Sequence, residues 1–436
     1  MLQTGFARVN ITPPLGTSLR GQYFERRADG ILDPLLGSAV AFFDGETKAI
    51  LMSLDIIGIP QILLDRYRQN IGRHLDLPME AVFIACTHTH LGPATVTEQG
   101  QVEEPAYVNW LETQLCDLGF LALQDLAPTT MHYTHGRVED VAFIRRYRMK
   151  DGRAKTNPGW QNPDILHPIG TPDEQSTLVI LKREGKPEIG IVNFQVHPDV
   201  ISGTKISADY PKFVRDTYEA NIPNSLCMYL NGAQGDTNHV DVRLGPDQIR
   251  HGYKRAEYMG RKIAMSVLAN YILAQPLEGE KVRFAQQELV CRHNKGLPEH
   301  MEEARRIYDI YLKEGHKIAI AKAKERGILT MWAAVRMISL QHEDDLKALH
   351  LTALAIGDVA FAGYPGEPFT EIGRSVKKNS PFTVTIPCCA ANGYEDYFPM
   401  QDAFDEEGYE AQAALYVGGT AERMIEASGA LLKTLK

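Results

Sequence analysis

The sequence has little of what marks several common protein classes. Six cysteines in 436 residues are too few for a disulfide scaffold in a chain of this length. Cys388 and Cys389 are adjacent, and Cys86 and Cys227 lie in apolar runs, which favours buried free thiols in a reducing compartment. No basic segment followed by an apolar core opens the chain, so no signal peptide is visible, although a chain trimmed after secretion would look the same. We therefore expect a cytoplasmic protein.

Long hydrophobic runs and basic patches are also missing. The longest apolar stretches, such as Ala49 to Ile59, are too short and too interrupted to span a bilayer. With 46 Lys and Arg against 55 Asp and Glu, the net charge of −9 argues against a partner with a phosphate backbone. We expect a small-molecule substrate, no nucleic acid and no stable membrane anchoring; a homo-oligomer is left open.

What the chain does have is an alternation of apolar strands and amphipathic helices. This alternation predicts an α/β fold of mixed β-sheets with flanking helices. Turn residues between apolar runs predict three hairpins, within residues 39–57, 177–196 and 348–361. Helices are expected over 61–75, 104–126, 210–221 and 246–275 and from Thr420, and residues 298–345 read as a helical insertion. We predict one catalytic domain over residues 1–436.

Polar residues of metal-binding type follow three of the apolar strands. His88 and His90 come directly after the run Ala81 to Cys86, His197 closes a second strand, and Glu367 follows a third. On an extended backbone the two-residue spacing places both imidazoles of the first pair on the same side. Zinc prefers imidazole nitrogen with a carboxylate, and a catalytic site leaves one position for water. The pattern predicts a catalytic zinc site.

Simpler interpretations of these residues stay open. A buried histidine is more often a hydrogen-bonded core residue than a ligand, and His-x-His alone is a weak signal. Glu367 lies between Pro365 and Pro368, where its carboxylate could cap the next helix. Asp236, in a Gly-Asp-Thr-Asn loop, is either a turn residue or a group that holds a metal ligand in place.

Other hydrolytic chemistries lack their motifs. The sequence contains no Gly-x-Ser-x-Gly elbow and no P-loop, which argues against the common serine hydrolases and nucleotide hydrolases. Cys86 precedes the histidines but lies inside the apolar strand, which disfavours a thiol nucleophile.

Taken together, the motifs resemble those of the neutral/alkaline, non-lysosomal ceramidase family, which are zinc amidases. Six blocks occur in the family's order: Gly5 with Asn10-Ile11-Thr12, Thr87-His-Thr-His-Leu-Gly-Pro93, Val196-His-Pro198, Gln234-Gly-Asp236, Pro365-Gly-Glu-Pro-Phe-Thr370, and the late tyrosines Tyr394, Tyr397 and Tyr416. The resemblance covers the catalytic domain only. The chain ends about a helix beyond Tyr416, with no room for the family's C-terminal β-sandwich.

The resemblance implies a role for each matching residue. The zinc ligands it implies are His88, His197, Glu367 and Tyr397. It also implies that His90 and Tyr416 face the substrate carbonyl as proton-transfer or oxyanion-stabilising groups. Arg145 matches the arginine of the family's Asn-Arg-Ser block, although Ile144 and Arg146 replace the neighbouring Asn and Ser.

We therefore predict a zinc-dependent hydrolase that cleaves an amide (N-acyl) bond of a small soluble substrate through a metal-activated water. Arg145 and Arg146 would pair with a substrate carboxylate or form ion pairs within the protein. A zinc-dependent esterase or lactonase acting on a carbohydrate-derived or other small substrate is the second hypothesis. A non-catalytic protein with a structural metal site is the third.

Overall fold

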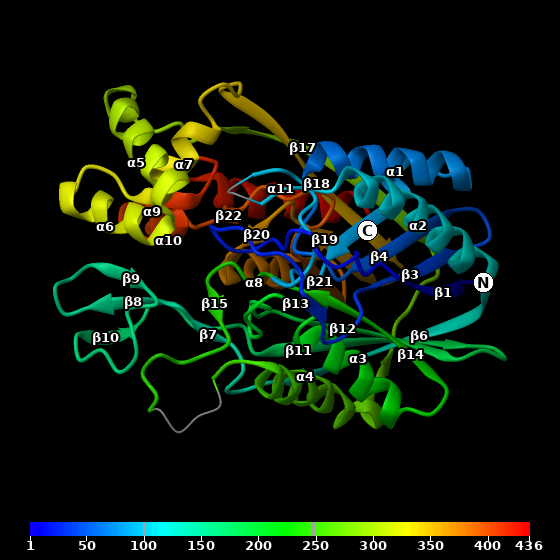
Figure 1. Cartoon of the computed structure of the whole chain (residues 1–436). Coiled ribbons are helices and arrows are strands. Elements are labelled where there is room, and N and C mark those ends of the chain that lie inside the picture. The colour runs from blue at the N-terminus through cyan, green and yellow to red at the C-terminus, as the bar shows by residue number, and fades with distance from the viewer. Residues whose placement is uncertain (99–100, 246–249) are drawn as a thin grey trace.

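The structure, a computed structural model, describes residues 1–98, 101–245 and 250–436. In this part of the chain the largest element is a mixed, nine-stranded sheet with parallel pairs at both edges of its main path (Figure 1). In spatial order its strands are β14 (Ser225–Asn231), β12 (Glu188–Phe194), β11 (Gln175–Arg183), β6 (Ala127–Arg137), β1 (Gln3–Asn10), β3 (Leu36–Phe43), β4 (Lys48–Leu54) and β5 (Val82–Cys86), with β16 (Gln275–Pro276) beside β6.

Helices cover one face of this sheet. Side chains on alternate strand positions, such as Ala41, Ile50 and Val192, join one buried cluster with the apolar stripes of four helices. These helices are α1 (Gln61–Leu75), α2 (Pro105–Gln124), α3 (Tyr210–Asn221) and α4 (Tyr253–Leu268).

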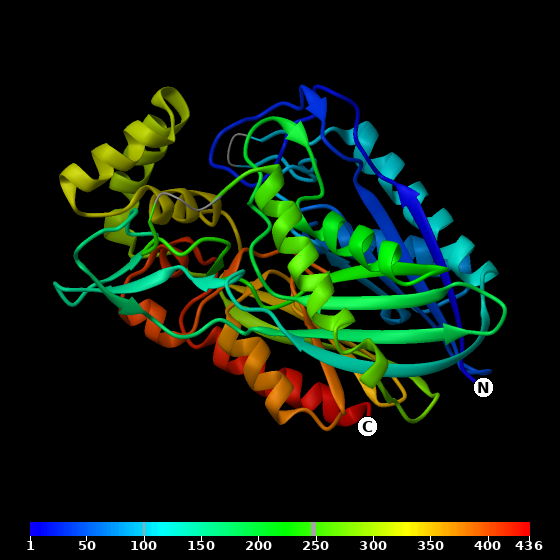
Figure 2. The same cartoon turned by 90° about the horizontal axis from the view of Figure 1, so that it is seen from below.

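The opposite face packs on a second sheet. Val40, Phe42 and Leu51 of the large sheet share a cluster with Leu354 and Phe361 of the smaller one. The smaller sheet has the order β17 (Val282–Arg292), β18 (Leu346–Ile356), β19 (Val359–Gly363) and β21 (Val384–Cys388). Its outer face is covered by α8 (Thr370–Asn379) and α11 (Thr420–Thr434), the orange and red helices of Figure 2. The resulting layers are helix, sheet, sheet and helix.

Smaller elements gather at one end of these layers. The helical unit α5 (Met301–Glu314), α6 (His316–Arg326) and α7 (Met331–Ser339) lies at the same end as the strands β8 (Arg146–Met149), β9 (Ala154–Thr156) and β10 (Ile165–Pro168) in both Figure 1 and Figure 2. Further short elements are β2 (Gly30–Ile31), β7 (Phe143–Ile144), β13 (Lys205–Ile206), β15 (Thr237–Asn238), β20 (Glu367–Pro368), β22 (Tyr397–Phe398), α9 (Gln401–Asp405), α10 (Tyr409–Ala413), and the 3₁₀ turns at Met79–Ala81, Tyr271–Leu273 and Pro298–His300.

The predicted fold class is confirmed, and so are the three hairpins and the helices at 61–75 and 210–221. Residues 298–345 are helical for most of their length; whether they form an insertion in a single domain stays a prediction. Of the helix expected over 246–275, residues 246–249 lie outside the described residues, and the helix observed is α4. Within the described ranges, no helix combines the length and the apolar character that crossing a bilayer would require.

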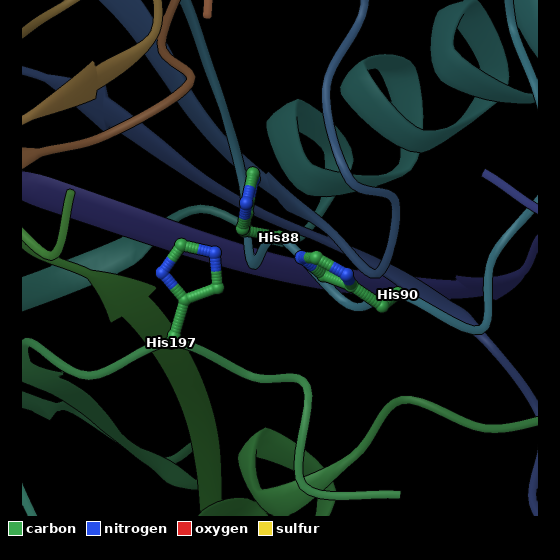
Figure 3. Close-up of side chains that lie close together, drawn as sticks. All are labelled: His88, His90 and His197. Atoms are coloured by element: carbon green, nitrogen blue, oxygen red, sulfur yellow. The ribbon is translucent and has the colours of Figure 1, made fainter. Parts of the chain in front are cut away.

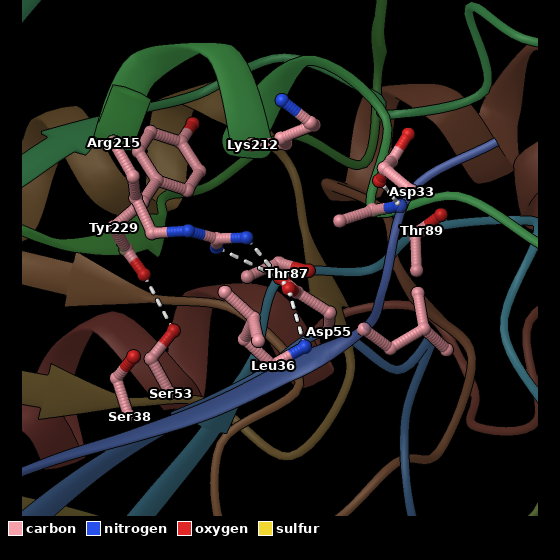
Figure 4. A network of polar contacts seen from close by, with 12 residues as sticks. Asp33, Leu36, Ser38, Ser53, Asp55, Thr87, Thr89, Lys212, Arg215 and Tyr229 are labelled. Atoms are coloured by element: carbon pink, nitrogen blue, oxygen red, sulfur yellow. Dashed lines mark hydrogen bonds and ion pairs between the residues drawn. The ribbon is translucent and has the colours of Figure 1, made fainter. Parts of the chain in front are cut away.

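A buried ion pair joins helix α3 to the end of strand β4. The Arg215 guanidinium donates to both carboxylate oxygens of Asp55, at 2.9 and 2.7 Å (Figure 4). The same carboxylate accepts the Leu36 N–H and the Thr87 hydroxyl, at 2.9 and 3.2 Å. Because all its partners are fixed, this carboxylate holds the residue before His88 against the rest of the sheet.

Removing one partner of this pair should be costly, because the other charge stays buried. We expect Arg215→Ala to lower the free energy of unfolding by about 3–5 kcal/mol, measured by urea denaturation. Asp216→Ala is the matched control: Asp216 is the exposed neighbour in the same helix, and its ion pair with Lys212 is a surface pair. Equal effects of the two substitutions would contradict a special role for the buried pair.

Candidate metal centre

Four chain segments bring their polar residues to one place. Strand β5 leads into His88, strand β12 leads into His197, and β19 leads into Glu367. Strand β20 pairs in parallel with β22, and their register sets Glu367 opposite Tyr397. The two ends of the main sheet path also approach each other: Ser53 of β4, the strand beside the edge strand β5, donates to the Tyr229 carbonyl of the other edge strand, β14, at 2.5 Å. Residues about 300 positions apart in sequence therefore share one site.

Three imidazoles form the centre of the site. His88, His90 and His197 each offer a ring nitrogen, and these three atoms lie within 4.8 Å of one another. Their rings meet edge to face, at centroid distances of 5.0 to 5.3 Å (Figure 3). His88 and His197 are at most 2% exposed. Such a set of nitrogens matches what zinc prefers.

Backbone carbonyls set the ring orientation of two of these histidines. The Nδ1 atom of His88 lies 2.7 Å from the Ile57 carbonyl oxygen, and that of His197 lies 3.4 Å from the Gln234 carbonyl oxygen. A carbonyl accepts only from N–H, so the proton is placed on Nδ1 and the lone pair on Nε2. This is the arrangement in which a second hydrogen bond orients a metal-ligating histidine.

Glu367 completes the donor set. Its Oε2 lies 3.5 Å from His88 Nε2 and 3.4 Å from His197 Nε2. Its Oε1 accepts the Tyr394 hydroxyl at 2.7 Å. One carboxylate and two imidazole lone pairs thus converge in a buried place.

The third histidine has no internal partner. Both ring nitrogens of His90 are buried and lack a hydrogen-bond partner among the described residues, as does Nε2 of His88. Burial, then the neighbouring His88, lowers the pKa of His90 to about 4. A Cβ on Gly21 would stand 2.6 Å from the His90 ring, and Gly21 has φ of +109°, so only glycine fits there. Unpaired polar atoms in so buried a place indicate a ligand site.

The expectation that this histidine run stays extended is wrong. His88 has φ of 73°, in the left-handed region that residues other than glycine rarely adopt. The chain turns because the His88 N–H donates to the Ile56 carbonyl and the His90 N–H donates to the Pro198 carbonyl, at 3.0 and 3.3 Å. The two rings still converge, through this turn rather than through strand alternation.

Tyr397 and Arg145 lie together beside the cluster. Tyr397 lines a small pocket with His90 and Glu367, and the Arg145 guanidinium lies 5.3 Å from the Tyr397 ring centre. Burial and the charge of Glu367 raise the pKa of Tyr397 well above its usual value. Arg145 donates to Glu410 at 2.7 Å and to the Gly235 carbonyl at 2.8 Å. The arginine is therefore fixed in place, with its charge over the phenol ring.

Arg146 and Tyr416 lie outside that small pocket, whose described lining does not include them. Arg146 donates to Glu406 at 2.6 Å, so of the two alternatives left open by the sequence the structure shows the ion pair within the protein. Tyr416 donates to Glu395 at 2.7 Å and stacks on His293. Its proposed contact with the substrate carbonyl stays a prediction.

Asp236 does not contact the imidazoles directly. Its carboxylate accepts the Thr370 N–H and hydroxyl, at 2.8 and 2.7 Å, and its carbonyl accepts the Arg145 N–H at 3.0 Å. Asp236 thereby ties the segment just after Glu367 to the segment that carries Arg145.

Several residues that line the small pocket received no role from the sequence, among them Tyr394, Arg20 and Tyr409. Tyr394 belongs to the late tyrosines, and its three-residue spacing from Tyr397 was the available signal. Arg20 and Tyr409 carried no such signal. Arg20 lies in an irregular loop. Tyr409 lies in a short helix, and its ring centre is 5.7 Å from that of Tyr397. Their places follow from tertiary packing alone.

No protein-family model matches the chain, and no curated protein matches it in sequence. Two solved structures are similar to it. One is the neutral ceramidase from Pseudomonas aeruginosa, with a TM-score of 0.75 and 15% identity over all of this chain and 74% of that one. The other is a ceramidase complexed with C2, with a TM-score of 0.75 and 16% identity over all of this chain and 75% of that one. The predicted resemblance to the ceramidase family is thus confirmed for the fold.

If the imidazole cluster binds zinc, zinc should stabilise the native state, because a ligand that binds only the folded protein shifts the unfolding equilibrium. We expect added zinc to raise the Tm of chelator-treated protein. His88→Ala and His197→Ala should each abolish this shift. The measurement is differential scanning calorimetry together with metal analysis.

The control for this experiment is His167→Ala, which removes an exposed histidine far from the cluster in sequence. This variant should keep the full zinc-dependent shift. An unchanged shift in the His88 and His197 variants would show that zinc binds elsewhere.

Proposed function

We propose that the chain is a zinc-dependent hydrolase of amide bonds in small molecules. The observation that carries this proposal is the convergence of His88 Nε2 and His197 Nε2 on one oxygen of Glu367, at 3.5 and 3.4 Å. Carbonyl acceptors on both Nδ1 atoms leave those lone pairs directed into the site. The shared fold with two ceramidases, of which one is solved as a complex with C2, supports amide hydrolysis as the reaction.

Two donor sets fit a zinc ion here. Both contain His88 and His197; one adds Glu367 with Tyr397, and the other adds His90. We favour the first set, because the Glu367 carboxylate supplies a negative charge to offset the cation and the second nitrogen of each ligating histidine is fixed by a carbonyl. A bound cation would also favour the phenolate of Tyr397 over the phenol.

Bound zinc would supply an acidified water, with a pKa of roughly 7, and a Lewis acid for the substrate carbonyl. The overall reaction adds the water oxygen to the acyl carbon and breaks the carbon–nitrogen bond. One water proton ends on the amine nitrogen and the other remains with the acid product. The protein must therefore move a proton and stabilise negative charge on the carbonyl oxygen.

We assign these two tasks to residues in and near the site. His90 lines the small pocket and has two unpaired ring nitrogens, so it is placed to accept a proton from water and return it to the amine. Arg145 positions Tyr397 through its charge over the ring, while Glu410 and the Gly235 carbonyl fix the arginine itself. Tyr416 is proposed as a donor to the carbonyl oxygen, where a fixed donor contributes about 3 kcal/mol.

The roles of His90 and Glu367 can be separated by substitution. Glu367→Gln should lose both zinc and turnover, since the amide removes a ligand charge. His90→Ala should keep zinc and lose turnover by about 10²–10⁴-fold, the usual contribution of a general base or acid. Metal analysis and kcat on the same preparations give the comparison. A His90 variant that loses zinc would instead favour the three-histidine donor set.

The reaction itself is tested with zinc-loaded protein on matched N-acetyl amides, esters and lactones, with a chelated sample beside each. We expect zinc-dependent release of the amine from amides. If esters or lactones are turned over faster than amides across the panel, ester or lactone hydrolysis replaces amide hydrolysis as the proposed function. If no substrate is turned over at full zinc content, the metal is structural.

A further inference from the structure

A larger cavity adjoins the small pocket of the metal centre. Its volume is about 470 Å³, which lies within the range of pockets that hold small ligands. The two spaces share five lining residues, namely Arg20, Tyr23, Tyr394, Asp396 and Ala413. The helical unit α5–α7 forms the far wall, with side chains that include Tyr308, Trp332 and Arg336. A molecule bound in the cavity would therefore have one end at the metal centre.

One wall residue is a buried cation without a counter-charge. Arg336 is 8% exposed, and its Nη1 donates to the Gln412 carbonyl at 2.6 Å. Its Nε is buried without a partner, and no carboxylate of the described residues forms an ion pair with it. Burial lowers the pKa of the guanidinium to about 10, so it stays charged at neutral pH. A buried charge without a partner is costly, which points to a ligand that supplies one.

Each of the other two cations around the cavity has a carboxylate partner. Arg20 forms an ion pair with Glu98. Lys347 donates to both oxygens of Glu395, at 2.8 and 2.7 Å. Of the other two carboxylates, Glu343 is exposed, and Asp396 lies at the boundary with the metal centre, where it interacts with Arg20. Arg336 is the cation of this described lining that no carboxylate neutralises.

Arg336 is also tied to the metal centre through its own helix. Thr330, at the start of α7, hydrogen bonds to the Gln412 side chain, while Arg336 bonds to the Gln412 carbonyl. On the same helix, the Trp332 ring lies 5.1 Å from Tyr409, whose ring lies 5.7 Å from Tyr397. Helix α7 therefore packs, through Trp332 and Tyr409, towards one proposed zinc ligand, Tyr397.

From this arrangement we propose that the cavity binds an anionic group, a carboxylate or a phosphate, carried by the substrate on the side away from the scissile bond, and that Arg336 recognises it. Arginine suits both groups, because its planar fork can donate two parallel hydrogen bonds to them. The substrate class is then a small anionic N-acyl compound. The inference rests on the proposed function in one respect, namely that the bound molecule is a substrate. The binding of the anion itself does not depend on catalysis.

The test uses matched pairs that differ in charge. One pair is N-acetylglycine and N-acetylglycinamide; the other is N-acetylethanolamine phosphate and N-acetylethanolamine. Calorimetric titration of the full chain, with and without zinc, should show tighter binding of the anionic member of at least one pair. Arg336→Gln should reduce that preference about ten- to a hundredfold, while the neutral members bind as before. The pair that responds distinguishes carboxylate from phosphate.

Two further variants keep the result interpretable. Arg305→Gln removes an exposed arginine of the same helical unit and should leave the preference unchanged. Arg336→Lys keeps the charge and should retain part of the preference. Tm and zinc content are measured for every variant. Equal loss of anionic and neutral binding with a lowered Tm would show that Arg336 only holds Gln412, and would overturn the proposal.

The outcome for the cavity is separate from the outcome for the reaction. Equal affinity for charged and neutral members in the unaltered protein would overturn the anion site even if both are hydrolysed. Arg336-dependent anion binding without any hydrolysis would support the site and overturn the proposed function.

Discussion

The buried pair of Asp55 and Arg215 is the constraint on which the site depends. It joins the end of strand β4 to helix α3, and through the Thr87 hydroxyl it also fixes the residue before His88. Asn231, at the end of the opposite edge strand, donates to the Thr87 carbonyl at 3.3 Å. The two edges of the main sheet path are therefore joined at one short segment. A bidentate pair between fully buried groups has the fixed geometry that such a junction requires.

Backbone strain collects around the same place. His88, Ala390, Asn392 and Asp396 all have φ between 44° and 73°. Each such residue costs of order 1–3 kcal/mol and persists only where the surroundings over-determine it. Here the surroundings are hydrogen bonds across segments: the Cys86 N–H donates to the Ala390 carbonyl, and the Ile84 N–H donates to the Asn392 side chain. The imidazoles are thus positioned before any ligand arrives, which reduces the reorganisation that binding requires.

Part of the fold and of the candidate site could be predicted from the sequence, and the rest could not, for physical reasons. Alternating apolar runs identified most strands of both sheets, and the residues directly after those strands, His88, His197 and Glu367, do converge. Strand β17 was missed, because only two of its side chains, Leu289 and Cys291, alternate as buried positions near its end. The turn at His88 depends on carbonyls of Ile56 and Pro198, and no local pattern encodes a partner so far along the chain. In the sequence Arg336 is indistinguishable from the other charged residues of its helix, because the lack of a neighbouring carboxylate is visible only in three dimensions.

Strands β17 and β18 pair in register from Val282 with Ile356 to Arg292 with Leu346. All of α5–α7 hangs between these two partners as the loop of a single hairpin, and it is this loop that carries Tyr308, Trp332 and Arg336 to the cavity. A hairpin's register is set by the strands themselves, and lengthening a surface loop costs little free energy. The strand pairing of the smaller sheet therefore does not depend on the length of this loop. Through the contact of Trp332 with Tyr409 the same loop also reaches the proposed metal centre, so a change in the loop would alter the wall of the cavity and the packing behind Tyr397 together.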